Sequence, residues 1–269
     1  MNIDQHTTLY GVVGTPIVHS LSPTMHNAAF SATGLNSVYL AFETDDIEGC
    51  LRGMRVLGIR GLSVTIPFKS EVIPFLDQVD PLAEKIGAVN TIVNDGGRLV
   101  GYNTDALGAF KALDEKIALP GRSCLVFGAG GAARAIGFML REKGVEISVV
   151  NRSRARGQAL ALSLECPYLP MDQIGERNAD LLIQTTPVGM YPHTDRCPIP
   201  EYLLRAGKVV MDIIYNPIET RLLKMATARG CVTISGFSMF VYQGAEQFRL
   251  WTGMNPPVSA MSDAVQEAL

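Results

Sequence analysis

Ser123-Cys124-Leu125-Val126-Phe127 runs directly into Gly128-Ala129-Gly130-Gly131-Ala132-Ala133, so a short apolar strand leads into the pattern G-x-G-x-x-A and then into a helix. In this pattern Gly128 permits a tight turn, Gly130 lets the backbone approach a pyrophosphate, and Ala133 lets the helix pack closely on the sheet. The first turn of such a helix presents N–H groups and a partial positive charge. The pattern predicts a dinucleotide-binding unit, with a plain tight turn as the alternative.

The residues after the next predicted strand indicate which dinucleotide would bind. An NAD site usually carries Asp or Glu about 20 residues beyond the glycines, where the acid accepts hydrogen bonds from the ribose 2′-OH. Here Asn151 is followed by Arg152, Ser153 and, further on, Arg156. A carboxylate would repel a 2′-phosphate, whereas a guanidinium can bind it through two parallel N–H bonds. The segment therefore favours NADP; the alternative is that the arginines only solvate the start of a helix.

Strand-like and helix-like segments alternate along the rest of the chain, which predicts an α/β fold with mainly parallel strands. The predicted strands cover residues 9–13, 37–42, 61–66, 124–127, 147–150, 181–184, 209–213 and 232–235. The predicted helices cover residues 23–33, 46–57, 106–116, 132–143, 154–164 and 240–252. Leu119-Pro120-Gly121-Arg122 is a turn signal directly before a new strand–glycine–helix unit, and it indicates the opening of a second domain.

Composition excludes several classes of function. The 269 residues carry 23 Lys and Arg against 26 Asp and Glu, so no basic surface for nucleic acid is expected. No apolar run reaches the ~18 to 20 residues of a membrane helix, and the polar N-terminus lacks the pattern of a secretory signal. The 5 cysteines are scattered without a CxxC pair, which indicates reduced thiols and a cytoplasmic protein. His19 and His26 lack a third ligand nearby, so no metal site is predicted.

The segment His19-Ser20-Leu21-Ser22-Pro23 precedes a predicted helix near the N-terminus. Ser22 suits the N-cap, Pro23 the first helical position, and Gly34 a C-terminal stop. Capping by Ser22 is the simple interpretation, but it does not explain Ser20. Two hydroxyls beside exposed helix N–H groups would suit a substrate carboxylate.

Three further polar residues are candidates for chemistry. Lys69 follows Ser63-Val64-Thr65-Ile66-Pro67, a strand predicted to end in a Pro-initiated helix, whose dipole would oppose the positive charge of Lys69. Asn90 and Asp105 lie where predicted strands or loops end. Each has a simpler interpretation, since Lys69 could merely solvate a surface, Asn90 could merely end a strand, and Asp105 could be a helix N-cap.

Together these segments resemble the shikimate dehydrogenase family over nearly the whole chain. The resemblance rests on motifs that occur in this order: His19-Ser20-Leu21-Ser22-Pro23, Ser63-Val64-Thr65-Ile66-Pro67-Phe68-Lys69, Gly87-Ala88-Val89-Asn90-Thr91, Gly101-Tyr102-Asn103-Thr104-Asp105, the glycine segment from Gly128 to Ala133, Asn151-Arg152-Ser153, Thr186-Pro187-Val188-Gly189-Met190, Asp212-Ile213-Ile214-Tyr215-Asn216-Pro217 and Gln243-Gly244-Ala245-Glu246-Gln247. Each motif alone is weak, but their joint order is specific.

The resemblance implies two α/β domains with the active site in a cleft between them. Residues 1–106 and 240–269 would form the substrate domain, with a mainly parallel sheet, and residues 107–239 a Rossmann-like NADP domain. The implied activity is the reversible reduction of 3-dehydroshikimate to shikimate with NADPH, a step of chorismate and aromatic amino acid biosynthesis. The expected partners are these small molecules, with neither nucleic acid nor membrane, and the protein would be a monomer or homodimer.

The resemblance also assigns roles to residues of this chain. Lys69 and Asp105 would be the catalytic pair. The implied substrate-binding residues are Ser20, Ser22, Thr65, Lys69, Asn90, Asp105, Tyr215 and Gln243. The implied cofactor-binding residues are Gly128, Ala129, Gly130, Gly131, Ala132, Ala133, Asn151, Arg152, Ser153, Arg156, Thr186, Val188, Gly236 and Met239.

The chain departs from the family pattern at a few positions and leaves alternatives open. Ser63 stands where many members carry Asn, Ser153 where Thr is usual, and Pro187 where Ser is frequent. Ser63 in particular bears on the choice of substrate. One alternative is a quinate/shikimate dehydrogenase or a related enzyme with an altered substrate; another is a non-catalytic NADP-binding sensor. A sensor would not need both Lys69 and Asp105.

Overall fold

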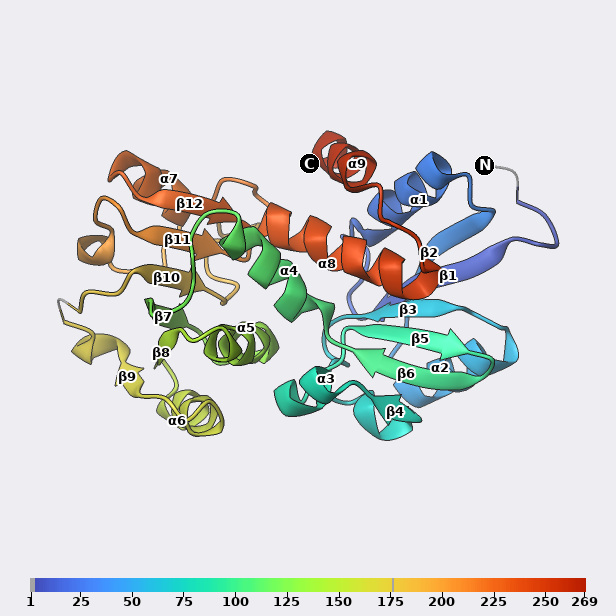
Figure 1. Ribbon diagram of the computed structural model, residues 1–269, viewed down its shortest axis with the longest axis horizontal. Helices are drawn as coiled ribbons and strands as arrows, with labels where there is room; N and C mark the ends of the chain where they lie inside the picture. Colours follow the sequence, from blue (N-terminus) through green and yellow to red (C-terminus); the bar gives the residue numbers. More distant parts are fainter. Residues whose placement is uncertain (1–2, 176) are drawn as a thin grey trace. The chain divides into compact units, whose positions relative to one another are not determined.

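Two six-stranded sheets, each with its own helices, form the chain in the computed structural model, which describes residues 3–175 and 177–269 (Figure 1). The chain separates into two compact units, one of residues up to Thr104 together with Val241–Leu269, the other of Asp105–Phe240. The chain leaves the first unit at the start of α4 (Thr104–Asp114) and returns to it within α8 (Gly236–Thr252). The α/β class predicted from the alternation of strands and helices is confirmed.

The first unit contains a mixed sheet in the order β2-β1-β3-β5-β6-β4. Its strands are β1 (Thr8–Gly14), β2 (Ser37–Glu43), β3 (Gly61–Val64), β4 (Gln78–Val79), β5 (Thr91–Asp95) and β6 (Arg98–Tyr102). Its helices are α1 (Ser22–Thr33), α2 (Ile47–Val56), α3 (Pro81–Ile86), the greater part of α8 and α9 (Val258–Ala268), with a 3₁₀ turn at η1 (Ile73–Phe75). β1 pairs in parallel with β2 and β3, and β4 with β6, whereas β5 runs antiparallel to both of its neighbours.

Several features of this unit differ from the sequence prediction, which included none of β4, α3 and α9. The antiparallel hairpin of β5 and β6 was not predicted, although its turn residues Gly96 and Gly97 both have positive φ angles, 59° and 98°, as a tight hairpin requires. The helix predicted after Pro67 is wrong, because residues 66–72 form turns. The backbone carbonyl of Lys69 accepts a hydrogen bond of 2.7 Å from the N–H of Val89 in a distant segment.

The second unit has the doubly wound order β12-β11-β10-β7-β8-β9, with every pair parallel. Its strands are β7 (Ser123–Phe127), β8 (Glu146–Asn151), β9 (Tyr168–Pro170), β10 (Leu181–Gln184), β11 (Val209–Asp212) and β12 (Val232–Ser235). Its helices are most of α4, α5 (Gly131–Glu142), α6 (Arg154–Ser163) and α7 (Arg221–Ala228), with 3₁₀ turns at η2 (Met171–Gln173) and η3 (Glu201–Leu203). α5 and α6 pack beside β7–β9, and α7 packs beside β11 and β12 (Figure 1).

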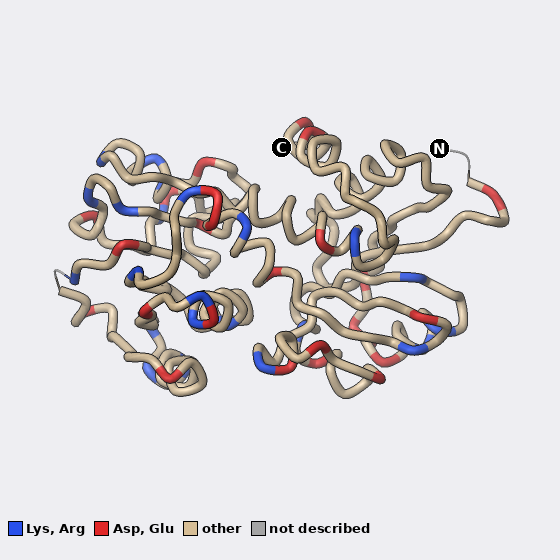
Figure 2. Tube along the Cα trace, viewed as in Figure 1, with Lys and Arg blue, Asp and Glu red and all other residues tan. Residues whose placement is uncertain are grey.

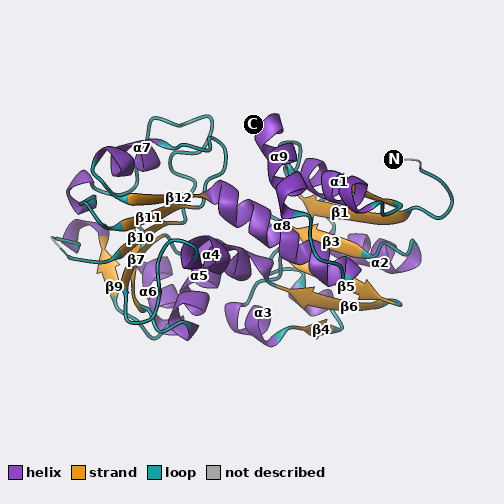
Figure 3. Ribbon diagram, turned by 45° about the horizontal axis from the view of Figure 1, so that its top comes forward, coloured by secondary structure: helices purple, strands orange, loops and turns teal. Residues whose placement is uncertain are grey.

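Each sheet is covered by helices whose buried faces follow helical spacing. On α2 the buried residues are Ile47, Leu51 and Met54, and they join the core formed with strand residues such as Leu62 and Val64. Full burial of each such side chain contributes about 1.5–3 kcal/mol. In the same unit α9, the last helix, lies along α1 (Figure 3).

Charged residues are dispersed over both units and do not gather on one element (Figure 2). The described part of the chain holds no helix with the length and apolar character needed to cross a membrane.

Candidate active site

The glycine turn after β7 has the backbone conformation that only glycine adopts readily. Gly128 has a φ angle of 129°, and a Cβ at this position would strike the hydroxyl of Thr185. Its N–H donates a hydrogen bond of 2.9 Å to the carbonyl of Val150 at the end of β8. The turn therefore lies at the carboxyl ends of β7, β8 and β10. This is the switch point of the sheet, where ligands of doubly wound folds bind.

The helix that follows is open at its N-terminus. Gly130 is the N-cap of α5, and no side chain caps the helix. A Cβ added to Gly130 or Gly131 would meet no described atom within 4 Å, so the backbone there has open space in front of it. Ala133, in contrast, is fully buried against the sheet. Uncapped N–H groups, the helix dipole and small residues fit the pyrophosphate of a dinucleotide.

The residues after β8 offer cationic side chains without a carboxylate. The side-chain amide of Asn151 donates to the carbonyl of Ser153 at 2.9 Å, which fixes the turn into α6. Arg152, Ser153 and Arg156 are exposed, and none of the ion pairs found among residues 3–175 and 177–269 includes either arginine. Two available guanidinium groups beside a hydroxyl fit a ribose 2′-phosphate.

A buried glutamine that the sequence analysis missed shapes the next loop. Gln184 ends β10 and is fully buried. Its Nε2 donates to the carbonyls of Thr186 and Val188 at 2.8 and 3.0 Å, and its Oε1 accepts from the N–H and hydroxyl of Thr186 at 2.9 and 3.0 Å. Thr186 and Val188, both predicted to line the cofactor site, are therefore held in a defined loop at the carboxyl edge of the sheet. A glutamine directly before the Thr-Thr-Pro sequence was the available signal.

A buried carboxyl group organises the loop after β11. Asp212 is fully buried and accepts hydrogen bonds from the Thr220 hydroxyl at 2.7 Å and the Ile214 N–H at 3.1 Å. Thr220 in turn caps α7 through the N–H of Leu223. Burial raises the pKa of Asp212 from 3.8 to about 6, against the opposing effect of these two hydrogen bonds.

Replacing Asp212 with asparagine should stabilise the protein at pH 8 by up to about 3 kcal/mol, the equivalent of about two pKa units. A pKa raised on folding means that the stabilising contribution is full below about pH 4 and is lost as the pH rises through about 6. Asparagine keeps one acceptor oxygen for the Ile214 N–H, and its NH2 group, in place of the second carboxyl oxygen, can donate to the Thr220 hydroxyl; the side chain never ionises. Urea unfolding at pH 8 and at pH 4 should show the gain only at pH 8; a variant that is less stable than the wild type at pH 8 would refute this account.

Tyr215, Gly236 and Met239 lie in the second unit. The ring of Tyr215 stacks on that of Phe240, with centroids 4.7 Å apart and an interplanar angle of 20°. Burial raises the pKa of Tyr215. Gly236 begins α8, and a Cβ there would strike the carbonyl of Ile213, so this close approach requires glycine. Met239 is buried one turn further along α8.

In the first unit the structure corrects the role of Ser22. Leu21 is the N-cap of α1, Ser22 is the first helical residue, and no side chain caps the helix. Instead the hydroxyl of Ser20 accepts a hydrogen bond of 3.3 Å from the N–H of Ser22. The predicted C-terminal stop is confirmed, since Gly34 is left-handed with a φ of 69°. The Ser20 hydroxyl thus lies at the first turn of α1, whereas the Ser22 side chain is buried and hydrogen-bonded to Tyr39.

Lys69 lies in a turn that is tied to the segment before β5. Besides the bond from Val89 to the Lys69 carbonyl, the Ser70 hydroxyl donates to the Gly87 carbonyl at 3.0 Å. Thr65 directly follows β3, and its N–H donates to the Val13 carbonyl of β1 at 3.0 Å. Lys69 and Thr65 are both half-buried. The helix dipole invoked for Lys69 has no counterpart, because no helix begins at Pro67.

Asn90 fixes the start of α4. Its Oδ1 accepts from the Thr104 N–H at 2.7 Å, and its Nδ2 donates to the Thr104 hydroxyl at 3.0 Å. The Oε1 of Gln243 lies 3.5 Å from both the Asn90 Nδ2 and the Thr104 hydroxyl. Asp105 is the next residue and belongs to the first turn of α4, so the N-cap interpretation of Asp105 is wrong. Asn90 is only 2% exposed, and its amide does more than end a strand.

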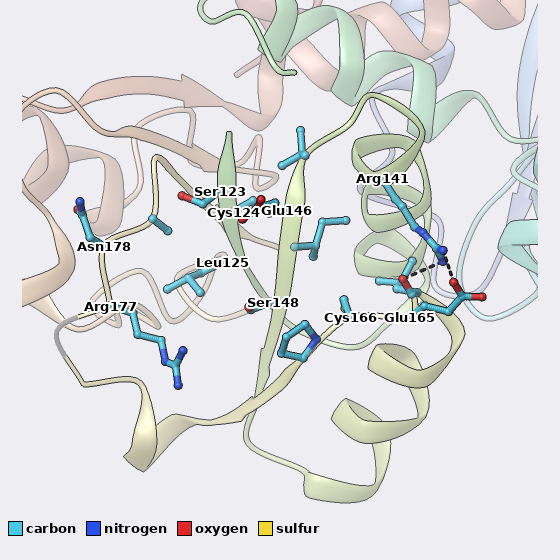
Figure 4. Close-up of a pocket in the computed structure, with 15 residues that line it drawn as sticks. Ser123, Cys124, Leu125, Arg141, Glu146, Ser148, Glu165, Cys166, Arg177 and Asn178 are labelled. Atoms are coloured by element: carbon cyan, nitrogen blue, oxygen red, sulfur yellow. Dashed lines mark hydrogen bonds and ion pairs between the residues drawn. The ribbon is translucent and has the colours of Figure 1, made fainter. Parts of the chain in front are cut away.

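The described side chains form no metal-ligating group, and a surface depression of the second unit lies away from these residues. No group of three metal-ligating side chains occurs in the described ranges, and His26 is fully buried, with a pKa lowered by burial to about 4. A depression of about 580 Å³ is lined by Ser123, Glu146 and Arg177, with Arg141 paired to Glu165 at one side (Figure 4). It lies at the amino ends of β7 and β8, the opposite edge from the Gly128 turn, and so is not the nucleotide site.

The doubly wound order, the Gly128 turn and the arginines after β8 define the second unit as a dinucleotide-binding unit of the Rossmann class. Comparison with known families agrees and is more specific. Residues 12–92 match the shikimate dehydrogenase substrate binding domain, residues 111–191 match shikimate / quinate 5-dehydrogenase, and residues 236–266 match the shikimate 5′-dehydrogenase C-terminal domain. The chain belongs to the shikimate dehydrogenase family.

Individual relatives cover the chain from end to end. It is 47% identical to a shikimate dehydrogenase (NADP⁺) from Thermococcus kodakarensis, over 99% of this chain and 98% of the relative. It is 43% identical to the enzyme of that name from Methanothermobacter thermautotrophicus, over 98% and 97% of the two chains. The crystal structure of shikimate 5-dehydrogenase from Thermus thermophilus in complex with NADP(H) and shikimate is 41% identical, with a TM-score of 0.91 over 97% of this chain and 100% of that one.

Proposed function

We propose that the protein catalyses the reversible, NADPH-dependent reduction of 3-dehydroshikimate to shikimate. The observation that carries the proposal is the Val89-Asn90 dipeptide, whose backbone holds the turn of Lys69 and whose side chain holds Thr104, the residue before Asp105. The segment of Lys69 and the residue before Asp105, which are distant in sequence, are thereby bonded to the neighbouring residues Val89 and Asn90. The names of the relatives, which share 43% and 47% identity with almost the whole chain, support the same reaction.

The proposed mechanism assigns one proton and one developing charge to residues of the first unit and the start of α4. Lys69 donates a proton to the alkoxide that forms from the ring ketone, and its charge stabilises that alkoxide. Asp105 orients the ammonium and binds the neighbouring hydroxyl. Ser20 and Ser22 bind the substrate carboxylate, while Thr65, Asn90 and Gln243 bind ring hydroxyls. Because Lys69 and Asp105 act as a pair, the pH profile belongs to both groups.

The second unit fits NADP(H), which supplies the hydride when bound. Gly128 to Ala133 would hold the pyrophosphate, with the N–H groups at the open start of α5 as donors. Asn151, Arg152, Ser153 and Arg156 would hold the adenosine 2′-phosphate, and Thr186, Val188, Gly236 and Met239 would hold the nicotinamide end. The proposal thus assigns substrate binding to residues 1–106 and 240–269 and cofactor binding to residues 107–239.

The decisive experiment follows the absorbance of NADPH while the purified protein oxidises shikimate. Turnover with shikimate and NADP⁺ that exceeds turnover with quinate or with NAD⁺ is expected. Faster turnover with quinate would favour the quinate/shikimate alternative. Binding of NADP⁺ by calorimetry without turnover of either substrate would favour the sensor and overturn the proposal.

We further propose a cytoplasmic location and a monomeric or homodimeric state. The cysteines support a reducing compartment, because all five, Cys50, Cys124, Cys166, Cys197 and Cys231, are free thiols. Burial raises the pKa of Cys124 strongly, which keeps that thiol unreactive. Light scattering of the purified protein would decide between one and two copies.

A further inference from the structure

Helix α8 carries a second glutamine, Gln247, one turn after Gln243. Gln247 is 1% exposed. Its Oε1 accepts hydrogen bonds from the Ser63 hydroxyl at 3.0 Å and from Nε2 of His26 at 3.1 Å. Its Nε2 donates to the Asn90 carbonyl at 3.3 Å and to the Thr91 hydroxyl at 3.0 Å. The amide thus joins α8 to α1, to β3 and to the start of β5, and both of its donors and its acceptor oxygen are in use.

The first arm of this network fixes the direction in which Ser63 can bind a ligand. The Tyr39 hydroxyl donates a hydrogen bond of 2.6 Å to the Ser63 hydroxyl, and the Ser63 hydroxyl in turn donates to Oε1 of Gln247. Because the Ser63 proton is used in the bond to Gln247 and one lone pair is used by Tyr39, the Ser63 oxygen has one lone pair left. It can therefore accept a hydrogen bond from a ligand but cannot donate one. Ser63 lies two residues before Thr65, on the same side of the extended chain and on the side opposite the apolar Leu62 and Val64.

The second arm fixes Asn90. The Thr91 hydroxyl, which accepts from Gln247, donates to Asn90 Oδ1 at 2.8 Å. The same Oδ1 accepts the Thr104 N–H at the start of α4. The Thr91 hydroxyl also lies 3.1 Å from the Thr104 hydroxyl. Loss of the Gln247 amide would remove the donor to Thr91 and the donor to the Asn90 carbonyl, and so would loosen the position of the Asn90 side chain.

His26 supports this assignment of donors and acceptors. The imidazole stacks on the Tyr39 ring at a centroid distance of 4.5 Å, and burial lowers its pKa to about 4, so the ring is neutral near pH 7. In the described part of the chain, its Nδ1 is the one buried side-chain polar atom that lacks a hydrogen-bond partner. If Nε2 carries the proton that is donated to Gln247, Nδ1 bears only a lone pair, and no buried N–H is left unsatisfied.

We propose that Gln247 is a positioning residue for substrate binding: it makes the Ser63 hydroxyl an acceptor for a substrate hydroxyl and holds Asn90 at the start of α4. The inference rests on the proposed function and deepens it, because it assigns the part of the network that selects a hydroxyl on the substrate ring. It also makes Ser63, which departs from the family pattern, a hydrogen-bond acceptor toward the substrate.

The test compares Gln247→Met with Phe248→Leu. Methionine keeps the length and volume of glutamine but removes the amide. Phe248 is the next residue, is fully buried and packs on Phe30, so its substitution loosens the same helix without touching the polar network. Q247M should raise the KM for shikimate roughly tenfold and leave the KM for NADP⁺ within about twofold. F248L should lower the melting temperature but change both KM values less than about twofold. Equal KM values in the two variants would show a structural role only and overturn the proposal.

A double-mutant cycle with Ser63→Ala provides the second arm of the test. S63A should raise the KM for shikimate roughly fivefold, and the double variant should match Q247M because the two residues act through one chain of bonds. Additive effects, roughly 50-fold in the double variant, would contradict the coupling. If Q247M fails to fold, S63A decides alone: an unchanged KM for shikimate refutes the role of Ser63. A wild-type protein without shikimate turnover would instead refute the proposed function, and calorimetric binding of shikimate to wild type and variants would still test the positioning role.

Discussion

Replacing Lys69 with alanine should lower the turnover number for shikimate oxidation roughly 100-fold or more, while the affinity for NADP⁺ stays within about twofold. The reason is that Lys69, the proposed proton donor in the reduction, takes the hydroxyl proton in the oxidation and supplies the charge that stabilises the alkoxide, and alanine does neither. The turn that carries Lys69 is held through backbone atoms, by the bond from Val89, so removal of the side chain leaves that bond in place. Steady-state kinetics together with calorimetric titration of NADP⁺ separates the two effects.

Lys111 provides a matched control, since it is an exposed lysine on α4. Lys111→Ala should retain turnover within about twofold, because a solvated surface charge contributes little to a barrier. Lys69→Arg is informative as well: a guanidinium keeps the charge but hardly releases a proton near neutral pH, so proton donation should remain impaired. Turnover of K69A within a few-fold of the wild type would remove Lys69 from the mechanism.

The second unit was largely predictable because its signals are local. Five of its six strands follow apolar runs, and the Gly128 pattern locates the switch point without any tertiary information. The strand that escaped prediction, β9, is the three-residue edge strand Tyr168–Pro170. A proline at the edge of a sheet gives almost no strand signal in sequence.

The first unit was harder because contacts between distant segments decide its local structure. Pro67 suits both the first turn of a helix and a tight turn. The contact with Val89 favours the turn, because the Val89 N–H donates to the Lys69 carbonyl. In a continuing helix that carbonyl would accept from the N–H of residue 73. The β5–β6 hairpin is a different case, since Asp95-Gly96-Gly97-Arg98 is a local hairpin signal that the alternation of strands and helices obscured.

The buried polar network could not have been found from sequence. Gln247 bonds to Ser63 and His26 across separations of 184 and 221 residues, and no spacing rule links such positions. The glutamine lies on the buried side of α8, where the helical pattern only predicts burial. Asp212 and Gln184 are different cases: each ends a buried strand and binds atoms of the loop that follows it, within eight residues, so a polar residue at the end of an apolar run was a local signal for both.

Replacing Arg152 with alanine should raise the KM for NADP⁺ roughly 30- to 100-fold, the cost of losing a charge-assisted, two-bond contact with a phosphate. The KM for NAD⁺, which lacks the 2′-phosphate, should change less than about twofold. The ratio of the KM for NAD⁺ to the KM for NADP⁺ would therefore fall by nearly the same factor as the KM for NADP⁺ rises. Arg152 is exposed in the turn between β8 and α6, so its loss should cost little stability.

Arg154 is the matched control for this change, because it is exposed and begins α6 only two residues further on. Arg154→Ala removes an equal charge from the same turn, so it reproduces any general loss of electrostatic attraction toward a polyanion. If recognition depends on direct contact, R154A should leave the KM for NADP⁺ within about threefold, and only R152A should shift the cofactor preference. Salt provides a second check, since the wild-type KM for NADP⁺ should rise with ionic strength more steeply than that of R152A. Equal losses toward NAD⁺ and NADP⁺ in R152A would mean that this arginine acts on the part common to both dinucleotides, and recognition of the 2′-phosphate would have to lie with Ser153 or Arg156.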